Sequence, residues 1–415
     1  MRRGSFLLFV AFLSPYLFGN TTEVSAQPLR LILPTSNHGL LHGDGPAFYQ
    51  YTNRTFRGER SKPWQGGRYG FVRNEKVTRA GVVFTRFHEG VDIKPVYRDD
   101  DGEPMDTVRA IDGGRVVYAN FEAGASDYGK YVVVEHWWSG SPFYSLYGHL
   151  GSVHVHAGQR VQQGDKLGIM GHTGVGIDRE RSHVHFEIDM LLSRNFDGWL
   201  HATYRRPRNE HGIYNGLNMA GLDVAQLYLE LQRDPNLTIR EFIARQDVFF
   251  EVSVPNDHLL DLQYRYPWLA GANFNPHARS LEIGFTRSGL PVQIRSSNER
   301  VDEPAVSSVR PSRANYGDIT NDLYSGRHGA DLSRHGRHYI DLLTMQTSDT
   351  RSGIIPIAET ETAPQENYPL ARPTILPVDA SAEPVGSVRA SAVAEGGEVE
   401  RDAGGPDDET LFHGW

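Results

Sequence analysis

The sequence contains no cysteine among its 415 residues. It therefore has no disulfide bonds, no thiolate metal ligand and no cysteine to which a lipid anchor could be attached. Any metal ion in this protein would have to be bound by histidine and carboxylate side chains. Stability must come from an ordinary hydrophobic core, and the length suits one large domain with extensions or two domains.

A surplus of basic residues is also absent. The net charge is −9, and residues 345–415 account for all of it, with 13 acidic against 4 basic residues. The remainder of the chain is balanced, with 38 residues of each sign. A surface that binds nucleic acid shows a basic patch or stripe. We therefore expect no nucleic-acid partner. The sequence also contains no evident internal repeat.

Long hydrophobic runs are missing except near the N-terminus. An apolar run over residues 5–18 follows Arg2 and Arg3, and small residues precede Gln27. This pattern is typical of a secretory signal peptide, with cleavage after residue 26. An uncleaved membrane anchor is the alternative, but the run is shorter than the ~20 apolar residues that span a bilayer. We expect an exported protein, periplasmic or associated with the cell envelope, without a stable membrane anchor after cleavage.

The residue composition and the hydrophobic pattern change several times after the predicted signal peptide. Residues 27–79 form an irregular lead-in with one expected strand, 29–33. Residues 80–191 contain short β-rich runs punctuated by glycine, which predicts a mainly β, antiparallel domain. Residues 192–214 are expected to be a linker. The strands expected in the β domain are 82–84, 107–111, 115–119, 131–138, 144–147, 166–170 and 183–190.

Residues 215–345 are expected to form a small α+β module of unknown role. Leu222, Ala225, Tyr228 and Leu229 share one helical face. Thr238 and Glu241 have the spacing of a capping box at the start of a second helix. The expected strands are 249–254, 260–266, 281–285 and 291–295. Residues 346–415 have too few large apolar side chains to fold and are expected to be a disordered acidic tail. The module or the tail could bind a protein partner.

Five residues could take part in metal chemistry. His183 and His185 would project from one face of a strand, and His88 and Asp92 share a face at a spacing of four. His149 lies between these two pairs in the sequence. A catalytic zinc uses three protein ligands and leaves the fourth position to water, so five candidates exceed what metal binding alone needs. The alternative for His183 and His185 is a pair of ordinary surface histidines.

Glu89 suggests another interpretation, the helical His-Glu-x-x-His motif of metalloproteases. The fifth residue here is Asp92, and Gly90 and Pro95 form helices poorly. We reject that interpretation and expect Glu89 to be exposed or to lie behind the ligands.

The motifs resemble those of the lysostaphin-type (LytM-domain, duplicated hybrid motif) zinc metallopeptidases over about residues 80–191. The resemblance rests on motifs that occur in the family's order. They are His88-x-x-x-Asp92, Ala110-Ile111-Asp112-Gly113-Gly114, Tyr147-Gly148-His149-Leu150, Gly171-His172-Thr173-Gly174 and His183-x-His185-Phe186-Glu187-Ile188.

The resemblance implies an antiparallel β domain with an open groove and a zinc ion on its floor. It implies zinc ligation by His88, Asp92 and His185, and catalytic roles for His149 and His183, without saying which histidine is the base. The implied activity is that of an exported metalloendopeptidase acting on peptidoglycan or another peptide substrate. The alternative is a non-catalytic member that binds cell wall or activates another hydrolase. Retention of all five residues favours the enzyme.

Two segments depart from the family's usual pattern. Residues 175–182 are longer than expected and carry four charged side chains, so substrate preference is open. Residues 98–106 are enlarged and acidic, but Asp99-Asp100-Asp101-Gly102 lacks the spacing of a calcium loop, so we expect a solvated loop.

Several other histidines could be mistaken for ligands. His154 and His156 repeat the spacing of His183 and His185 without the residues that follow the true motif, so we expect no metal there. His38 and His42 suggest that the lead-in occludes the cleft, a hypothesis that deletion of residues 27–75 would test.

Overall fold

The computed structural model describes residues 27–56, 58–78, 81–204, 209–311, 323–325 and 331–345. The predicted signal peptide, 1–26, and the predicted acidic tail, 346–415, lie outside the described residues. Antiparallel strands dominate the described part of the chain, so the predicted mainly β class is confirmed.

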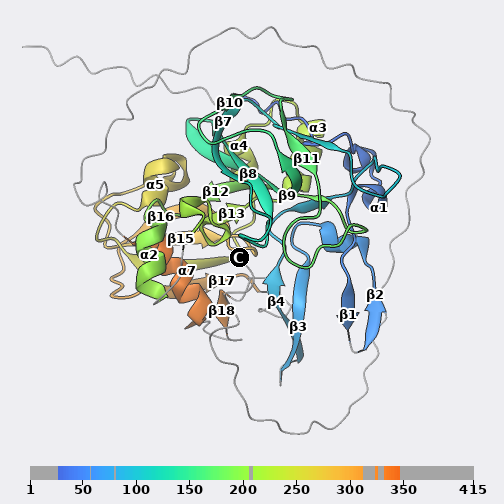
Figure 1. Cartoon of the computed structure of the whole chain (residues 1–415). Coiled ribbons are helices and arrows are strands. Elements are labelled where there is room, and N and C mark those ends of the chain that lie inside the picture. Colours follow the sequence, from blue (N-terminus) through green and yellow to red (C-terminus); the bar gives the residue numbers. More distant parts are fainter. Residues whose placement is uncertain are drawn as a thin grey trace, which may run out of the picture.

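A nine-stranded sheet forms the centre of the fold (Figure 1). Its strands run in the order β10-β7-β8-β9-β11-β6, and β12 pairs with β9, β5 and β13 beside this path. Every pairing in it is antiparallel. The bounds are β5 (Val91–Ile93), β6 (Thr107–Arg109), β7 (Gly114–Asn120), β8 (Lys130–Trp138), β9 (Ser141–Val153), β10 (Arg160–Val161), β11 (Lys166–Met170), β12 (Val184–Leu191) and β13 (Met219–Gly221).

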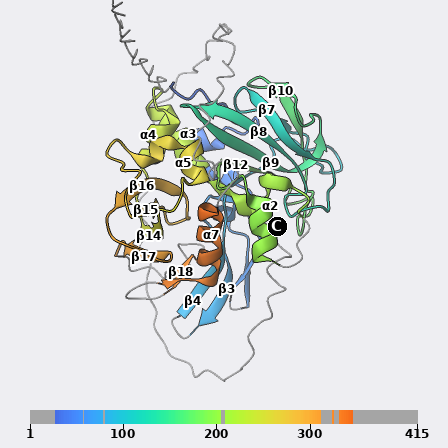
Figure 2. The same ribbon diagram turned by 90° about the vertical axis from the view of Figure 1, so that its left-hand side faces the viewer.

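Smaller sheets and short helices surround the central sheet (Figures 1 and 2). The four-stranded sheet has the order β16-β15-β14-β17, with β14 (Phe250–Pro255), β15 (Ser280–Phe285), β16 (Pro291–Ser297) and β17 (Ala305–Val309). Three strand pairs join β1 (Arg54–Phe56) to β2 (Glu59–Ser61), β3 (Val72–Thr78) to β4 (Gly81–Phe87), and β18 (Tyr324–Ser325) to β19 (Asp331–Leu332). The α-helices are α1 (Gly45–Phe48), α2 (Phe196–Thr203), α3 (Val224–Arg233), α4 (Ile239–Ala244), α5 (Asp261–Arg265) and α7 (Arg334–Thr344), and the 3₁₀ helices are η1 (Gly39–His42), η2 (Trp64–Gly67), η3 (Gly212–Tyr214), η4 (Gly216–Asn218) and η5 (Pro267–Ala270).

The helices are too short to cross a bilayer in the part of the chain that is described. Helices α2 and α7 lie side by side (Figure 2), and the Trp199 indole donates a hydrogen bond to the His338 carbonyl at 2.9 Å. The central and four-stranded sheets share one cluster of buried apolar residues, which includes Phe186 and Ile283. The domain boundaries inferred from the sequence remain predictions.

Two strand predictions are wrong. Residues 260–266 form the helical turn α5, because the buried Asp261 and Arg265, four residues apart, pair at 3.0 Å along one helix face. Residues 29–33 have no strand partner; Leu29 donates its N–H to the Leu237 carbonyl and Ile32 donates to Ile111. Apolar alternation alone did not distinguish these segments from strands.

The predicted capping box at the start of α4 is confirmed. The Thr238 hydroxyl accepts a hydrogen bond from the Glu241 N–H at 3.2 Å, and the Glu241 carboxylate accepts from the Thr238 N–H at 2.9 Å. These bonds satisfy two donors that the first turn of a helix leaves without helical partners.

We expect Thr238→Ala to lower the free energy of unfolding by about 1 kcal/mol, because the Glu241 N–H loses its acceptor. Urea denaturation of the full chain measures the change. Arg240→Ala, at an exposed position of the same helix, is the matched control and should change stability little. Equal effects of the two substitutions would contradict a capping role for Thr238.

Candidate metal centre

Strand pairing brings two of the predicted ligands together. Strand β12 pairs with β5 so that His185 lies opposite Asp92, and with β9 so that His185 lies opposite Gly148. Residues directly opposite each other in antiparallel strands project from the same face, with their Cβ atoms about 5 Å apart. His88 lies in the turn between β4 and β5 and completes the group from one side.

His88, Asp92 and His185 are buried, with their candidate ligand atoms all within 4.8 Å of one another. Asp92 Oδ1 lies 3.0 Å from His88 Nε2 and 2.9 Å from His185 Nδ1, and the two nitrogens are 3.2 Å apart. Ligands bound to zinc at about 2.0–2.1 Å in a tetrahedron would be separated by about 3.3 Å. The donor set and its spacing therefore fit a zinc ion.

The other nitrogen of each candidate ligand histidine is fixed by a hydrogen bond. His88 Nδ1 donates to the Arg68 carbonyl at 2.8 Å, and His185 Nε2 donates to the Glu187 carboxylate. Tyr128 donates its hydroxyl hydrogen to the same carboxylate at 3.0 Å. These partners select the tautomer that directs a lone pair into the site.

No role was predicted from the sequence for Arg68, Glu187 or Tyr128. Glu187 could have been found, because residues two apart on a strand share a face and His185 needs a partner for its second nitrogen. Arg68 acts through its backbone carbonyl, for which the residue type gives no signal. Tyr128 lies between strands β7 and β8, outside the motifs.

Charges and hydrogen bonds within the site shift the pKa values of Asp92 and His185. Burial alone would raise the pKa of Asp92, but His88 and His183 outweigh burial and hold it well below its usual value. Burial would lower the pKa of His185, but its hydrogen bonds to Asp92 and Glu187 dominate and raise it to about 10. A bound metal ion would compete with a proton for the His185 nitrogen.

His149 and His183 lie beside the ligand group. Their ring centroids are 4.7 Å apart, and the His149 ring is 5.8 Å from that of His185. His183 Nε2 lies 3.4 Å from Asp92 Oδ1. Both side chains are buried. These distances show that the structure brings all five predicted site residues to one location.

The Nδ1 atoms of both histidines donate to backbone carbonyls. His149 Nδ1 bonds the Thr173 carbonyl at 2.8 Å, and His183 Nδ1 bonds the Arg181 carbonyl at 2.7 Å. In the neutral form each ring therefore carries its hydrogen on Nδ1 and a lone pair on Nε2. Burial, together with His183 and His185, lowers the pKa of His149 well below its usual value, so this ring is neutral near pH 7.

The backbone of His149 has an unusual conformation. Its φ is +59°, in the left-handed region that residues other than glycine seldom occupy. Strict alternation along β9 would direct His149 to the same face as the buried Tyr147, opposite to the face of Gly148. The left-handed residue interrupts the alternation and allows the imidazole to lie beside His183. No sequence pattern indicated this turn of the backbone.

The lead-in also supports the ligands. Gln50 donates its N–H to the Asp92 carbonyl at 2.9 Å, and Arg68 accepts the bond from His88. His38 and His42 are exposed, and occlusion of the cleft by the lead-in remains a hypothesis. His154 and His156 are exposed as well, with the His154 ring bonded to the Ser152 hydroxyl at 2.9 Å.

Comparisons with known proteins found similarity in the region of the predicted family resemblance. Residues 86–196 match the model of Peptidase family M23. A lipoprotein NlpD/LppB homolog of Pseudomonas aeruginosa is 35% identical over 115 residues, which are 26% of this chain and 33% of that protein. The matching region thus spans about a third of the length of this curated relative.

Two solved structures are also similar. A putative peptidase M23 from Pseudomonas aeruginosa is 26% identical, covering 26% of this chain and 40% of that one, with a TM-score of 0.20. A zinc containing peptidase from Vibrio cholerae is 25% identical, covering 34% and 36% of the two chains, with a TM-score of 0.22. The match to the family model confirms the predicted resemblance: residues 86–196 match peptidase family M23.

Proposed function

We propose that the protein is an exported zinc-dependent metalloendopeptidase that hydrolyses stem peptides or cross-links of bacterial peptidoglycan. The observation that carries the proposal is the gathering of three candidate ligands and two further histidines in one buried group. Membership of residues 86–196 in a peptidase family supports peptide hydrolysis. The similarity to a lipoprotein NlpD/LppB homolog supports a role in the cell envelope.

Zinc would be held by His88, Asp92 and His185, which supply two imidazole nitrogens and one carboxylate oxygen. Three protein ligands leave one position for water or substrate, the arrangement of a catalytic rather than a structural zinc site. When bound, zinc supplies Lewis-acid chemistry, because it lowers the pKa of a water ligand to about 7 and polarises the scissile carbonyl.

The two remaining histidines would move the proton and stabilise the developing charge. With Nδ1 of each ring bonded to a carbonyl, only Nε2 can face the reacting atoms. A neutral imidazole accepts a proton there, and a protonated imidazole donates a hydrogen bond to an oxyanion. His149 is neutral near pH 7, the state in which its Nε2 can accept a proton, so we assign it as the base. His183 would be the donor once its Nε2 has taken up a proton, because in a neutral ring with Nδ1 bonded to the Arg181 carbonyl that atom has only a lone pair.

The proposal extends to the rest of the chain. Cleavage of the signal peptide, residues 1–26, would release the protein into the periplasm or the cell envelope. The β domain over residues 80–191 would hold the active site, and the module over residues 215–345 or the acidic tail would bind a protein partner. The other candidate is a non-catalytic protein that binds cell wall or activates another hydrolase. The module over residues 215–345 and the acidic tail would also suit that role, because they could bind a partner.

We expect the zinc-loaded wild-type chain to release soluble muropeptides from purified peptidoglycan, and a chelator to abolish the release. His149→Ala should slow release by about a hundredfold or more, because the group proposed as general base is removed. Chromatography of the released fragments measures the rate. Metal analysis should show that the variant retains zinc, since His149 is outside the proposed ligand set.

The matched control is His154→Ala, which removes an exposed histidine elsewhere on the surface and should leave release unchanged. Equal release by wild type and His149→Ala would contradict the enzymatic proposal. Binding to peptidoglycan without any release would favour the non-catalytic alternative.

We expect Glu187→Ala to weaken zinc affinity by about 10- to 100-fold, because His185 loses the acceptor that orients its ring. Competition with a chromophoric chelator measures the dissociation constant. Glu135→Ala, on β8, is the control for loss of a carboxylate from the same sheet. An unchanged dissociation constant in Glu187→Ala would show that this carboxylate does not support the metal.

A further inference from the structure

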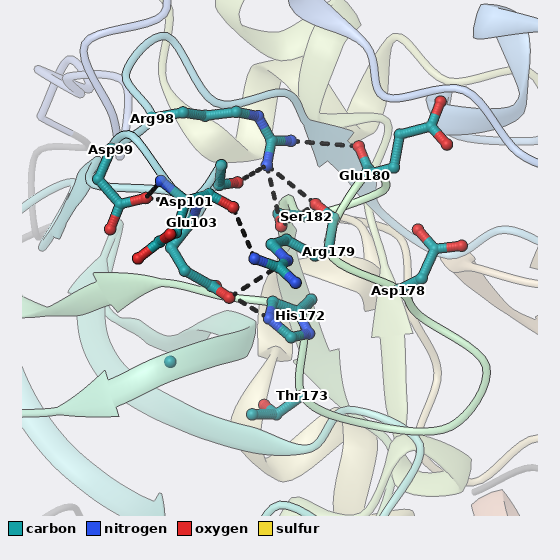
Figure 3. Close-up of polar contacts among 12 residues, drawn as sticks. Arg98, Asp99, Asp101, Glu103, His172, Thr173, Asp178, Arg179, Glu180 and Ser182 are labelled. Atoms are coloured by element: carbon teal, nitrogen blue, oxygen red, sulfur yellow. Dashed lines mark hydrogen bonds and ion pairs between the residues drawn. The ribbon is translucent and has the colours of Figure 1, made fainter.

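Two loops beside the metal centre are joined by arginine side chains. Arg98 Nη1 donates to the Arg179 carbonyl at 2.9 Å and to the Gly102 carbonyl at 2.7 Å (Figure 3). Its Nη2 donates to the Glu180 carbonyl at 3.1 Å. One guanidinium therefore links the enlarged segment around residues 98–103 to the loop over residues 172–182, which contains the long segment 175–182 and which we call the long loop.

Arg179 of the long loop in turn contacts the segment around residues 98–103. Arg179 Nη1 donates to the Asp101 carbonyl at 2.6 Å, and Arg179 Nε lies 3.5 Å from Glu103 Oε1 (Figure 3). The second oxygen of Glu103 lies 3.0 Å from His172 Nε2, at the other end of the long loop. Residues 98–103 thus contact both ends of the loop over residues 172–182. We refer to residues 98–103 as the brace.

Each end of the long loop supplies a carbonyl to one of the proposed catalytic histidines. Thr173, next to His172, accepts the Nδ1 hydrogen of His149 at 2.8 Å. Arg181, which follows Glu180, accepts the Nδ1 hydrogen of His183 at 2.7 Å. The brace therefore holds the residues adjacent to both carbonyls.

We infer that Arg98 and Glu103 are positioning residues that act on the two catalytic histidines through the long loop. The inference rests on the proposed function for its effect on hydrolysis. Glu103 holds the His172 end, which fixes the carbonyl for His149, and Arg98 holds the Glu180 end, which fixes the carbonyl for His183. A neutral imidazole has one N–H, so the carbonyl that accepts it decides which nitrogen has the lone pair.

Arginine suits this position better than lysine. Its planar guanidinium has five N–H donors in a fixed fork and can bond several carbonyls at once, whereas an ammonium acts as a single point of charge. Arg98 is exposed, so it contributes little to global stability. Its replacement should therefore leave the fold intact and allow a test of positioning.

The test compares Arg98→Ala with Arg115→Ala in the full chain. Arg115 is also exposed, pairs with Glu135 at 3.4 Å and lies on β7, so it is a matched control. We expect Arg98→Ala to lower kcat by about tenfold or more, with KM changed less than about threefold and zinc content unchanged. Arg98→Lys should not restore kcat, and added guanidinium should partly restore the Arg98→Ala variant.

A second readout does not depend on hydrolysis. NMR of histidine labelled with nitrogen-15 distinguishes the two tautomers, and His149→Ala and His183→Ala spectra assign the signals. We expect Arg98→Ala to mix the tautomers of His183, and Glu103→Ala to mix those of His149. Each substitution should leave the other histidine unchanged.

Unchanged tautomers in both variants would overturn the inference, as would a kcat for Arg98→Ala equal to that of Arg115→Ala in an active enzyme. A wild-type chain that hydrolyses nothing, but whose tautomers respond as expected, would refute the proposed enzyme and support the brace. The two proposals can therefore fail separately.

Discussion

The pairing of β12 with its neighbours is the constraint on which the candidate site depends. The pairing of β12 with β5 places His185 opposite Asp92, and the pairing of β12 with β9 places His185 opposite Gly148. A shift of this register by one residue would direct His185 into the core and Val184 into the site. The apolar side chains that alternate with the polar ones therefore fix the position of the ligands as well as the sheet.

The same strand concentrates acidic groups behind the candidate ligands. His185, Glu187 and Asp189 alternate with Val184, Phe186 and Ile188 along β12, and all of them are buried. Burial and the nearby Glu187 raise the pKa of Asp189 well above its usual value, which favours the neutral acid. A neutral Asp189 limits the negative charge beneath the site, while Glu187 remains available to orient His185.

The sequence predicted those features of the site that follow from alternation and spacing. His185 in β12 and His183 just before it lie two apart and both contact the candidate site, and the order of the motifs indicated the family resemblance, which the comparison confirmed. The conformation of His149 was not predictable, because a left-handed residue has no signature in a Tyr-Gly-His-Leu motif. The backbone carbonyls of Thr173 and Arg181 could not be predicted as acceptors either, because any residue type can supply a carbonyl.

Helix and strand assignments failed where local pattern competed with tertiary contacts. Residues 260–266 alternate like a strand, yet Asp261 also accepts a hydrogen bond from the Arg194 N–H at 2.8 Å, a contact between distant parts of the chain. Burial of a charged Asp261 depends on its two arginine partners, so the turn of α5 is favoured over an extended segment.

Strand β13 has a consequence for where the β domain ends. It pairs with Asp189–Leu191 of β12, and Gly221 lies so close to the Glu89 carbonyl that an added Cβ would be 2.3 Å from that oxygen. The Gly221 carbonyl also accepts the Tyr69 hydroxyl hydrogen at 2.9 Å. The family match ends at residue 196, before this strand. A fragment cut there would leave the Asp189–Leu191 edge of β12 unpaired, so the strand pairing of the central sheet extends past the residues that match the family model.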